Sequence, residues 1–273
     1  MTSCESERAF AVVVAGVAIA LLAGSCRSAL PPIRFAPSGT DVARLRSDFA
    51  LTDAERLVLT PANIKELVQE QVDQIYERLS AGPIPDGSFR GDLFFPRGVD
   101  KHATLRDVSG QVPSSLEKIA ALPVERIGRA LWKGKAFYKS QGILRNRIEE
   151  LALLKPLIDD TSGIQRMNFD GQTTWMLFPA KVTCGESRLD PTRPSIVIDY
   201  ARGSEVEGYR PVPDKLAGPE GLNIRDEIRV VRPGFYLGRA YFGSKFGLNF
   251  TLLDPTKPAG APLTPDIRDN CGP

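Results

Sequence analysis

A series of short strand patterns, each separated from the next by a turn signal, is the feature that most constrains the fold. From Ser88 onward apolar residues recur with a period of two, which is the period of a half-buried strand. Turn dipeptides such as Asp170-Gly171 and Pro233-Gly234 stand between the strands. The predicted strands, about ten in number, cover residues 88–95, 131–139, 143–149, 164–169, 173–178, 180–186, 195–201, 224–231, 235–242 and 246–253. Short connections and few helices between them predict a mainly β fold, an antiparallel meander that closes into a barrel of about eight to ten strands.

An amphipathic helix is predicted ahead of the strands. Thr60 fits an N-cap and Pro61 a first helical position. Apolar residues then recur at spacings of three and four for about 20 residues, until Gly82-Pro83. Such a helix needs an apolar surface to pack on, which the strand domain would supply. Shorter helical pieces are predicted over residues 41–49, 53–58, 115–122 and 124–131.

One long connection interrupts the strands at residues 202–222. It is rich in Gly and Pro. A connection of this length often has a function, and we interpret it as a flap over one end of the barrel.

The N-terminal segment has a different character. Ala9 to Gly24 is an unbroken apolar run, which is shorter than the roughly 20 residues of a membrane span but has the length of a signal-peptide core. The string Leu22-Ala-Gly-Ser-Cys26 resembles the bacterial lipobox, in which small residues precede a cysteine. This resemblance implies a signal peptide over residues 1–25 and a lipid, with acyl chains such as palmitate, on Cys26. A plain secretory signal and an uncleaved anchor helix are the alternatives.

A lipid on Cys26 would anchor the protein to a membrane of the cell envelope, facing the periplasm. Arg27, rather than Asp, follows the cysteine, which favours the outer over the inner membrane. We interpret residues 26–59 as a lipid-anchored tether with short helical pieces, 60–255 as the helix plus barrel domain, and 256–273 as a Pro-rich tail.

The cysteines support this compartment. Of the four cysteines, Cys4 leaves with the signal and Cys26 carries the lipid, so Cys184 and Cys271 remain. An even pair in an oxidising compartment predicts a disulfide, with two free thiols as the alternative.

Several classes of function find no support in the sequence. Lys+Arg number 35 and Asp+Glu 33, so no concentrated basic surface for nucleic acid is indicated. The single histidine, His102, lies in a predicted loop, and no nucleophile elbow, metal motif or phosphate loop accompanies it. We therefore expect no catalytic residues, no metal and no cofactor that the sequence can name.

Two carboxylates stand in strand patterns among apolar neighbours. Alternation places Asp226 on the face that carries Ile224 and Ile228, and Asp199 ends an otherwise apolar run. An unpaired buried charge is costly, so each carboxylate needs a partner, and Lys135 is one candidate. Either these charges form structural ion pairs, or they orient the polar group of an apolar ligand. The tentative ligand-binding set is Trp132, Lys133, Asp199, Tyr200, Asp226, Tyr236, Arg239 and Tyr241.

Several strings together resemble a family of uncharacterised bacterial lipoproteins. They are the segment from Ala81 to Gly87 with Arg90-Gly91, the string Trp132-Lys-Gly-Lys, the run Ile196-Val-Ile-Asp-Tyr, and Arg225-Asp-Glu-Ile-Arg with the Pro233-Gly-Phe-Tyr string. In that family a helix precedes a strand-rich domain of calycin-like or lipocalin-like appearance. The resemblance, over about residues 60 to 253, implies a calycin-like barrel and no established activity.

Three functions remain open from the sequence. The leading interpretation is a binding protein whose barrel holds a small hydrophobic molecule. The first alternative is an enzyme that uses Asp199, Asp226 or Glu227 on a hydrophobic substrate, with Tyr236 or Arg225 as stabiliser. The second is a structural or assembly lipoprotein that presents an exposed apolar patch.

Overall fold

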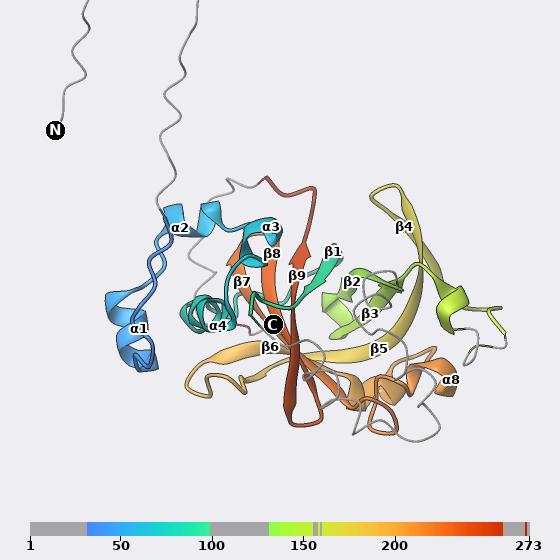
Figure 1. The fold of residues 1–273 in the computed structure, drawn as a ribbon. Helices are drawn as coiled ribbons and strands as arrows, with labels where there is room; N and C mark the ends of the chain where they lie inside the picture. Colours follow the sequence, from blue (N-terminus) through green and yellow to red (C-terminus); the bar gives the residue numbers. More distant parts are fainter. Residues whose placement is uncertain (1–31, 99–130, 155–157, 159, 259–270, 272–273) are drawn as a thin grey trace, which may run out of the picture.

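The computed structural model describes residues 32–98, 131–154, 158, 160–258 and 271. The strands are β1 (Gly87–Phe94), β2 (Trp132–Tyr138), β3 (Ile143–Ile148), β4 (Arg166–Phe169), β5 (Gln172–Glu186), β6 (Pro194–Asp199), β7 (Ile224–Arg232), β8 (Phe235–Phe242) and β9 (Lys245–Leu253). They form one antiparallel sheet in the order β3-β2-β1-β9-β8-β7-β6-β5-β4, and a further pairing of β3 with β5 closes it (Figure 1).

The closed part is an eight-stranded antiparallel barrel. Apart from β4, each strand pairs with the one before and after it in the chain, and β9 returns to β1. This is an up-and-down meander without an open edge, as the strand pattern predicts. The predicted mainly β fold is therefore confirmed, and the barrel is consistent with a calycin-like one.

The prediction of two strands at 173–178 and 180–186 is wrong, because β5 is a single strand of 15 residues. It pairs in turn with β4, β3 and β6 along its length. Phe178, at φ 51°, adopts a left-handed conformation at the boundary between the two predicted strands. The chain bends there and continues, since a partner strand is present on both sides of the bend.

The prediction of one helix of about 20 residues is also wrong. The chain forms α3 (Pro61–Ile64) and α4 (Gln69–Arg78) with a break between them. The predicted start is confirmed, because the Thr60 side chain accepts the N–H of Asn63 and Pro61 follows. At the break, extended Val68 bridges to Arg97, whose N–H donates to Leu67 O (2.9 Å). A contact distant in sequence thus overrides local helical periodicity.

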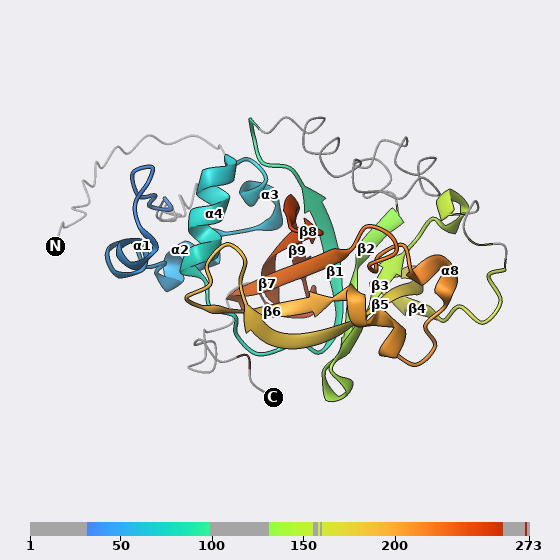
Figure 2. The same cartoon turned by 90° about the horizontal axis from the view of Figure 1, so that it is seen from below.

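Helices cover one side of the barrel, and their contact surface forms a second apolar core. The shorter helices α1 (Val42–Asp48) and α2 (Asp53–Val58) form where the sequence predicts them. Figure 2 shows α1 to α4 together on one side. Their buried side chains pack on the outer wall made by β1, β7 and β8, and the core residues are Leu51, Leu59, Ile64, Val72, Ile75, Tyr76, Leu79, Phe94, Val231, Phe235 and Leu237. From residue 33 onward, the segment that we expected to be a tether thus packs on the domain.

The two ends of the barrel differ. At the far end of β7, Val230 N–H donates to Ser80 O (2.9 Å), and Tyr236 OH donates to Pro83 O (3.2 Å). The segment from 80 to 84 therefore closes this end. At the opposite end lies the predicted flap, which carries η4 (Tyr200–Glu205) and α8 (Pro211–Asp214). Its Leu216 and Ala217 belong to the barrel core.

Other predictions fall outside the described residues. These are the signal peptide, Cys26, His102, and the helical pieces at 115–122 and 124–131 apart from Leu131. Among the described residues, no helix is long and apolar enough to cross a membrane.

Candidate functional site

Five polar side chains meet inside the barrel. They come from β2, β3, β7 and the start of η4, and we call them the interior cluster: Trp132, Lys135, Asn146, Tyr200 and Asp226. Strand pairing brings them together. Lys135 lies opposite Asn146, and Asp226 lies opposite Ile198, two residues before Tyr200. Their neighbours on the inner face are apolar. The interior cluster is therefore a polar island in an otherwise apolar core.

The Lys135 ammonium is the centre of the interior cluster. Its Nζ donates to Asn146 Oδ1 (3.0 Å), Tyr200 OH (2.6 Å) and Asp226 Oδ2 (2.8 Å). An ammonium has three donors, so all of them are used. Trp132 Nε1 also donates to Asn146 Oδ1 (2.8 Å), and Tyr200 OH to Asp226 Oδ2 (3.2 Å). Side chains alone therefore hold the charge.

Aromatic rings surround the same ammonium. Lys135 Nζ lies 5.3 Å, 5.2 Å and 5.4 Å from the ring centroids of Trp132, Tyr200 and Phe250. Two glycines make room for these rings. A Cβ on Gly91 would lie 2.4 Å from Trp132, and one on Gly238 would lie 2.2 Å from Phe250. The resulting cage suits a cation that has lost its water.

Burial sets the protonation of the interior cluster. Burial lowers the pKa of Lys135, while the charge of Asp226 and its hydrogen bond raise it again. Burial also raises the pKa of Tyr200 well above its usual value, and the Asp226 charge adds to this. The phenol therefore stays neutral at pH 7 and can both donate and accept a hydrogen bond.

Apolar side chains lie near the interior cluster at the flap end of the barrel. Leu93, Leu222 and Ile224 pack on the core but remain partly exposed, and so does the ring of Trp132, which also belongs to the interior cluster. Ile224 shares the inner face of β7 with Asp226, and Leu93 lies on β1 opposite Phe250. We call these four residues the apolar rim. The interior cluster thus lies toward the end of the barrel that carries the apolar rim.

Three of the predicted ligand-binding residues, Trp132, Tyr200 and Asp226, meet in the interior cluster. Tyr236 also faces the barrel interior, but at the closed end, where its hydroxyl binds a backbone carbonyl. The structure does not bring it to the others.

The remaining predicted residues lie elsewhere. Lys133 forms an ion pair with Glu149 (2.7 Å) on the outer face. The Asp199 side chain accepts the N–H of Ala201 (2.9 Å) at the start of η4. Arg239 and Tyr241 lie on the outer wall. Arg239 forms an ion pair with Asp73 of α4, and its Nε donates to Tyr241 OH (3.1 Å).

Asn146 belongs to the interior cluster although the sequence reasoning did not identify it. A signal was present, because Asn146 alternates with Leu144 and Ile148 in the same way that Asp226 alternates with isoleucines. Its Nδ2 donates to Phe178 O (3.0 Å) and Tyr200 OH (3.0 Å). It thus connects the interior cluster to the bend of β5.

A second set of buried polar groups lies between α4 and the barrel wall. We call it the outer cluster: Tyr76, Asp190, Ser195 and Arg229. Arg229 donates to Asp190 Oδ2 (3.1 Å) and Ser195 Oγ (3.1 Å), and the hydroxyls of Tyr76 and Ser195 lie 3.0 Å apart. Arg229 also donates to the carbonyls of Tyr76 (3.2 Å) and Arg193 (3.0 Å).

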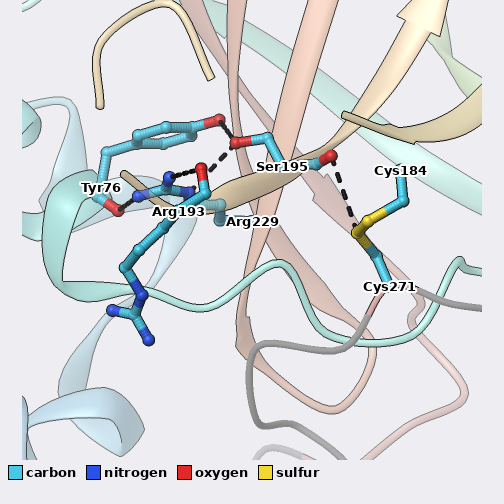
Figure 3. The surroundings of a disulfide bond; sticks show 6 residues. All are labelled: Tyr76, Cys184, Arg193, Ser195, Arg229 and Cys271. Carbon is cyan, nitrogen blue, oxygen red and sulfur yellow. Dashed lines mark hydrogen bonds between the residues drawn. A yellow bond between two sulfur atoms is a disulfide. The ribbon is translucent and has the colours of Figure 1, made fainter. Parts of the chain in front are cut away.

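The disulfide lies on the other side of Ser195, as Figure 3 shows. It joins Cys184 of β5 to Cys271, with the two Cα atoms 5.4 Å apart. Cys271 is buried, and its Sγ lies 3.8 Å from Ser195 O. The predicted pairing is confirmed, and it holds Cys271 to the barrel wall.

The three carboxylates of the enzyme alternative do not share a site. Asp226 points into the barrel, whereas Glu227 points outward, where it accepts the N–H of Arg188 (3.0 Å) and the Nε–H of Arg225 (3.2 Å). Asp199 ends β6. Among the described residues, no group of three or more His, Cys, Asp or Glu side chains could hold a metal ion.

Comparisons with known proteins name no family for this chain. No family model matches it, and no curated protein matches it either. Among solved structures, a protein from Thermomonospora curvata is similar with a TM-score of 0.35 and 18% sequence identity, over 70% of this chain and 90% of that one. Function is therefore inferred from the residues of this chain alone.

Proposed function

We propose that this protein is a lipid-anchored lipoprotein of the cell envelope whose barrel binds a small apolar molecule that carries one polar group. The closed barrel is a fold that can bind such a ligand. The observation that carries the proposal is the interior cluster, a caged and desolvated Lys135–Asp226 pair (2.8 Å) near the apolar rim. Replacing a buried ion pair by apolar side chains of similar volume often leaves stability unchanged or raises it. Stability alone therefore gives little reason for this pair, and binding gives one.

The partners of Lys135 favour exchange with a ligand. Each of its acceptors is a side-chain oxygen, and none is a backbone carbonyl. A ligand carboxylate or carbonyl at Lys135 would replace one of these acceptors, while a ligand hydroxyl would bind Asp226 or Tyr200. The apolar part of the ligand would lie among the rings of the cage and the apolar rim.

Export is the part of the proposal that rests on the N-terminus. The lipobox-like string before Cys26 implies lipidation, and the Cys184–Cys271 disulfide is typical of an oxidising compartment. The anchor would hold the barrel at a membrane surface, with the outer membrane favoured by Arg27. The resemblance to uncharacterised calycin-like lipoproteins stays part of this proposal.

Lipidation is tested by labelling cells with palmitate while they express the full chain. We expect the label in the membrane-bound protein and its loss in Cys26→Ser. Label that persists in Cys26→Ser would contradict the anchor without touching the binding proposal.

Ligand binding is tested with dodecanoate as the probe, titrated against the extracted protein. We expect saturable binding, and Ile224→Arg in the apolar rim should weaken it roughly tenfold or more, because a charge replaces apolar contact. Val68→Arg is the matched control, since Val68 is 41% exposed on the helical side. Comparing the affinities for dodecanoate and dodecanol tests the polar group, because only dodecanoate can accept a hydrogen bond from Lys135 as an anion.

Two results would contradict ligand binding. One is that dodecanoate shows no saturable binding and native mass spectrometry detects no co-purifying apolar molecule. The other is equal weakening by Ile224→Arg and Val68→Arg, which would place the probe on the surface.

The assembly alternative receives less support from the described residues. It predicts an exposed apolar patch, for which the segment 61–80 is one candidate place. In the structure Val72, Ile75 and Leu79 are buried against the barrel wall. Among the large apolar side chains of that segment, Val68 alone is exposed.

A further inference from the structure

A hollow of about 410 Å³ lies on the outside of the barrel, away from the interior cluster. The outer faces of β3 and β5 form its floor, and its sides are the stretch 163–165 before β4 and the connection 207–214. Figure 2 shows α8 beside β4 and β5 at this place. A hollow of this size matches small-molecule sites.

Two guanidinium groups line the hollow, and backbone carbonyls hold both of them. Arg145 donates to Glu207 O, and Arg210 donates to Ser162 O (2.6 Å) and Asp160 O (3.0 Å). Each of these groups has five N–H donors, so several remain for a ligand. Neither arginine forms an ion pair with a carboxylate among the described residues.

Glycines border both guanidinium groups. A Cβ on Gly208 would lie 3.2 Å from Arg145 Nη2, and one on Gly163 would lie 3.9 Å from Arg210 Nη1. Both glycines have φ +73° or +72°, a conformation that other residues rarely adopt. The backbone therefore approaches each cation without a side chain to cover it.

Two carboxylates, Glu207 and Asp214, also line the hollow, and neither forms an ion pair with Arg145 or Arg210. Asp214 is buried, and its two oxygens accept the N–H groups of Phe178 (2.7 Å) and Arg210 (2.8 Å). It therefore serves to fix the backbone around the bend of β5. The Glu207 side chain is exposed to solvent at the edge.

The other lining groups suit hydroxyls and a ring. The Tyr138 hydroxyl is buried and has no hydrogen-bond partner in the described part of the chain. Gln141 and Gln165 add amide groups that donate and accept, and Ile143 and Met176 add an apolar surface. Such a mixture of planar polar groups with an apolar wall fits a hydroxyl-bearing ring.

We infer that this outer hollow binds a small carboxylate that carries hydroxyl groups, of the class of the sugar acids. Arg145 and Arg210 bind the carboxylate, and Tyr138 with the glutamines binds the hydroxyls. The site is separate from the barrel interior, so it stands or falls independently of the apolar ligand proposed above.

The test uses the extracted full-length protein with D-glucuronate as the probe and D-glucose as its uncharged counterpart. Calorimetric titration should show saturable binding of glucuronate at concentrations up to about 10 mM, and glucose should bind at least about tenfold more weakly. Arg145→Gln should raise the Kd for glucuronate about tenfold, because a charge-assisted hydrogen bond is lost. Arg90→Gln, on the exposed side of β1, should leave the Kd unchanged.

Tyr138→Phe keeps the test valid if Arg145→Gln fails to fold. It removes only an unpartnered hydroxyl, so the unfolding midpoint should stay the same or rise while glucuronate binds several-fold more weakly. Equal binding of glucose and glucuronate, or an unchanged Kd in both variants, would overturn the inference. Inorganic phosphate that binds as tightly as glucuronate would overturn the sugar-acid class, since hydroxyls would then contribute nothing.

Discussion

The interior cluster and the outer cluster both bury charge, but they bind it in different ways. In the outer cluster Arg229 reaches Asp190 and Ser195 and also the carbonyls of two chain segments. In the interior cluster Lys135 reaches side-chain oxygens only. Arg229 is fully buried, and all five of its N–H donors have acceptors in the protein, so it fixes segments of the chain and has no donor left for a ligand. The acceptors of Lys135 are all side-chain oxygens, which a ligand can replace. The comparison assigns stability to the outer cluster and binding to the interior cluster.

The largest effect is expected from Arg229→Met. The change leaves several buried acceptors without their donor, so the free energy of unfolding should fall by about 3–5 kcal/mol in urea titrations. Arg90→Met is the matched control, because Arg90 is exposed and pairs with Asp170. A loss of unfolding free energy below about 1 kcal/mol would contradict a structural role for the outer cluster.

Loss of the disulfide beside the outer cluster should come next. Cys184→Ser combined with Cys271→Ser opens a link across 87 residues. The free energy of unfolding should fall by about 3 kcal/mol, because the unfolded chain regains freedom. Reducing agent should bring the wild-type protein to the same value and leave the double variant unaffected. Binding of dodecanoate at the interior cluster should not change while the protein is folded.

Asp226→Asn tests the interior cluster. Asn keeps an acceptor for Lys135 but removes the charge, so we expect a loss of about 2 kcal/mol at pH 7. Without Asp226 the pKa of folded Lys135 falls further below its unfolded value. The unfolded state then binds more protons in the window between the two pKa values, and stability rises with pH there. The difference in the free energy of unfolding between Asp226→Asn and the wild type should therefore become smaller as pH rises from about 7 to 10.

A double variant provides the control for that change. Lys135→Met with Asp226→Leu removes both charges, so the unfolding free energy should return close to wild type. Binding should lose its preference for dodecanoate over dodecanol. A double variant that unfolds like Asp226→Asn, with head-group preference intact, would show that the interior cluster serves stability rather than binding.

The smallest effect is expected from Glu55→Gln, a buried charge outside both clusters. Burial raises the pKa of Glu55, but N–H donors from Arg34 and Thr52 outweigh it and lower the pKa to about 2. The loss should be about 1 kcal/mol at pH 7. A carboxylate with a lowered pKa stabilises the folded state at pH values above its unfolded pKa, and this stabilisation is lost as the pH falls toward about 2. The free energies of unfolding of the variant and the wild type should therefore converge at that pH. Convergence already above pH 5 would contradict this.

Part of the molecule was predictable from local patterns. The period of two placed most strands, the Thr60-Pro61 signal placed a helix start, and the cysteine count predicted the disulfide. Each of these depends on near neighbours or on counting. Asp226 was recognised for the same reason, since alternation shows which face of a strand a residue occupies.

The tertiary structure decided the rest. The bridge from Val68 to Arg97 broke the helix, and partners on both sides kept β5 continuous. A shift in register between Trp132 and Gly134 turned Lys135 inward with Trp132 and left Lys133 outside. The sequence by itself determined that strands alternate and that buried charges need partners. Only closure of the barrel determined which charges meet, because that depends on pairing between strands far apart in the chain.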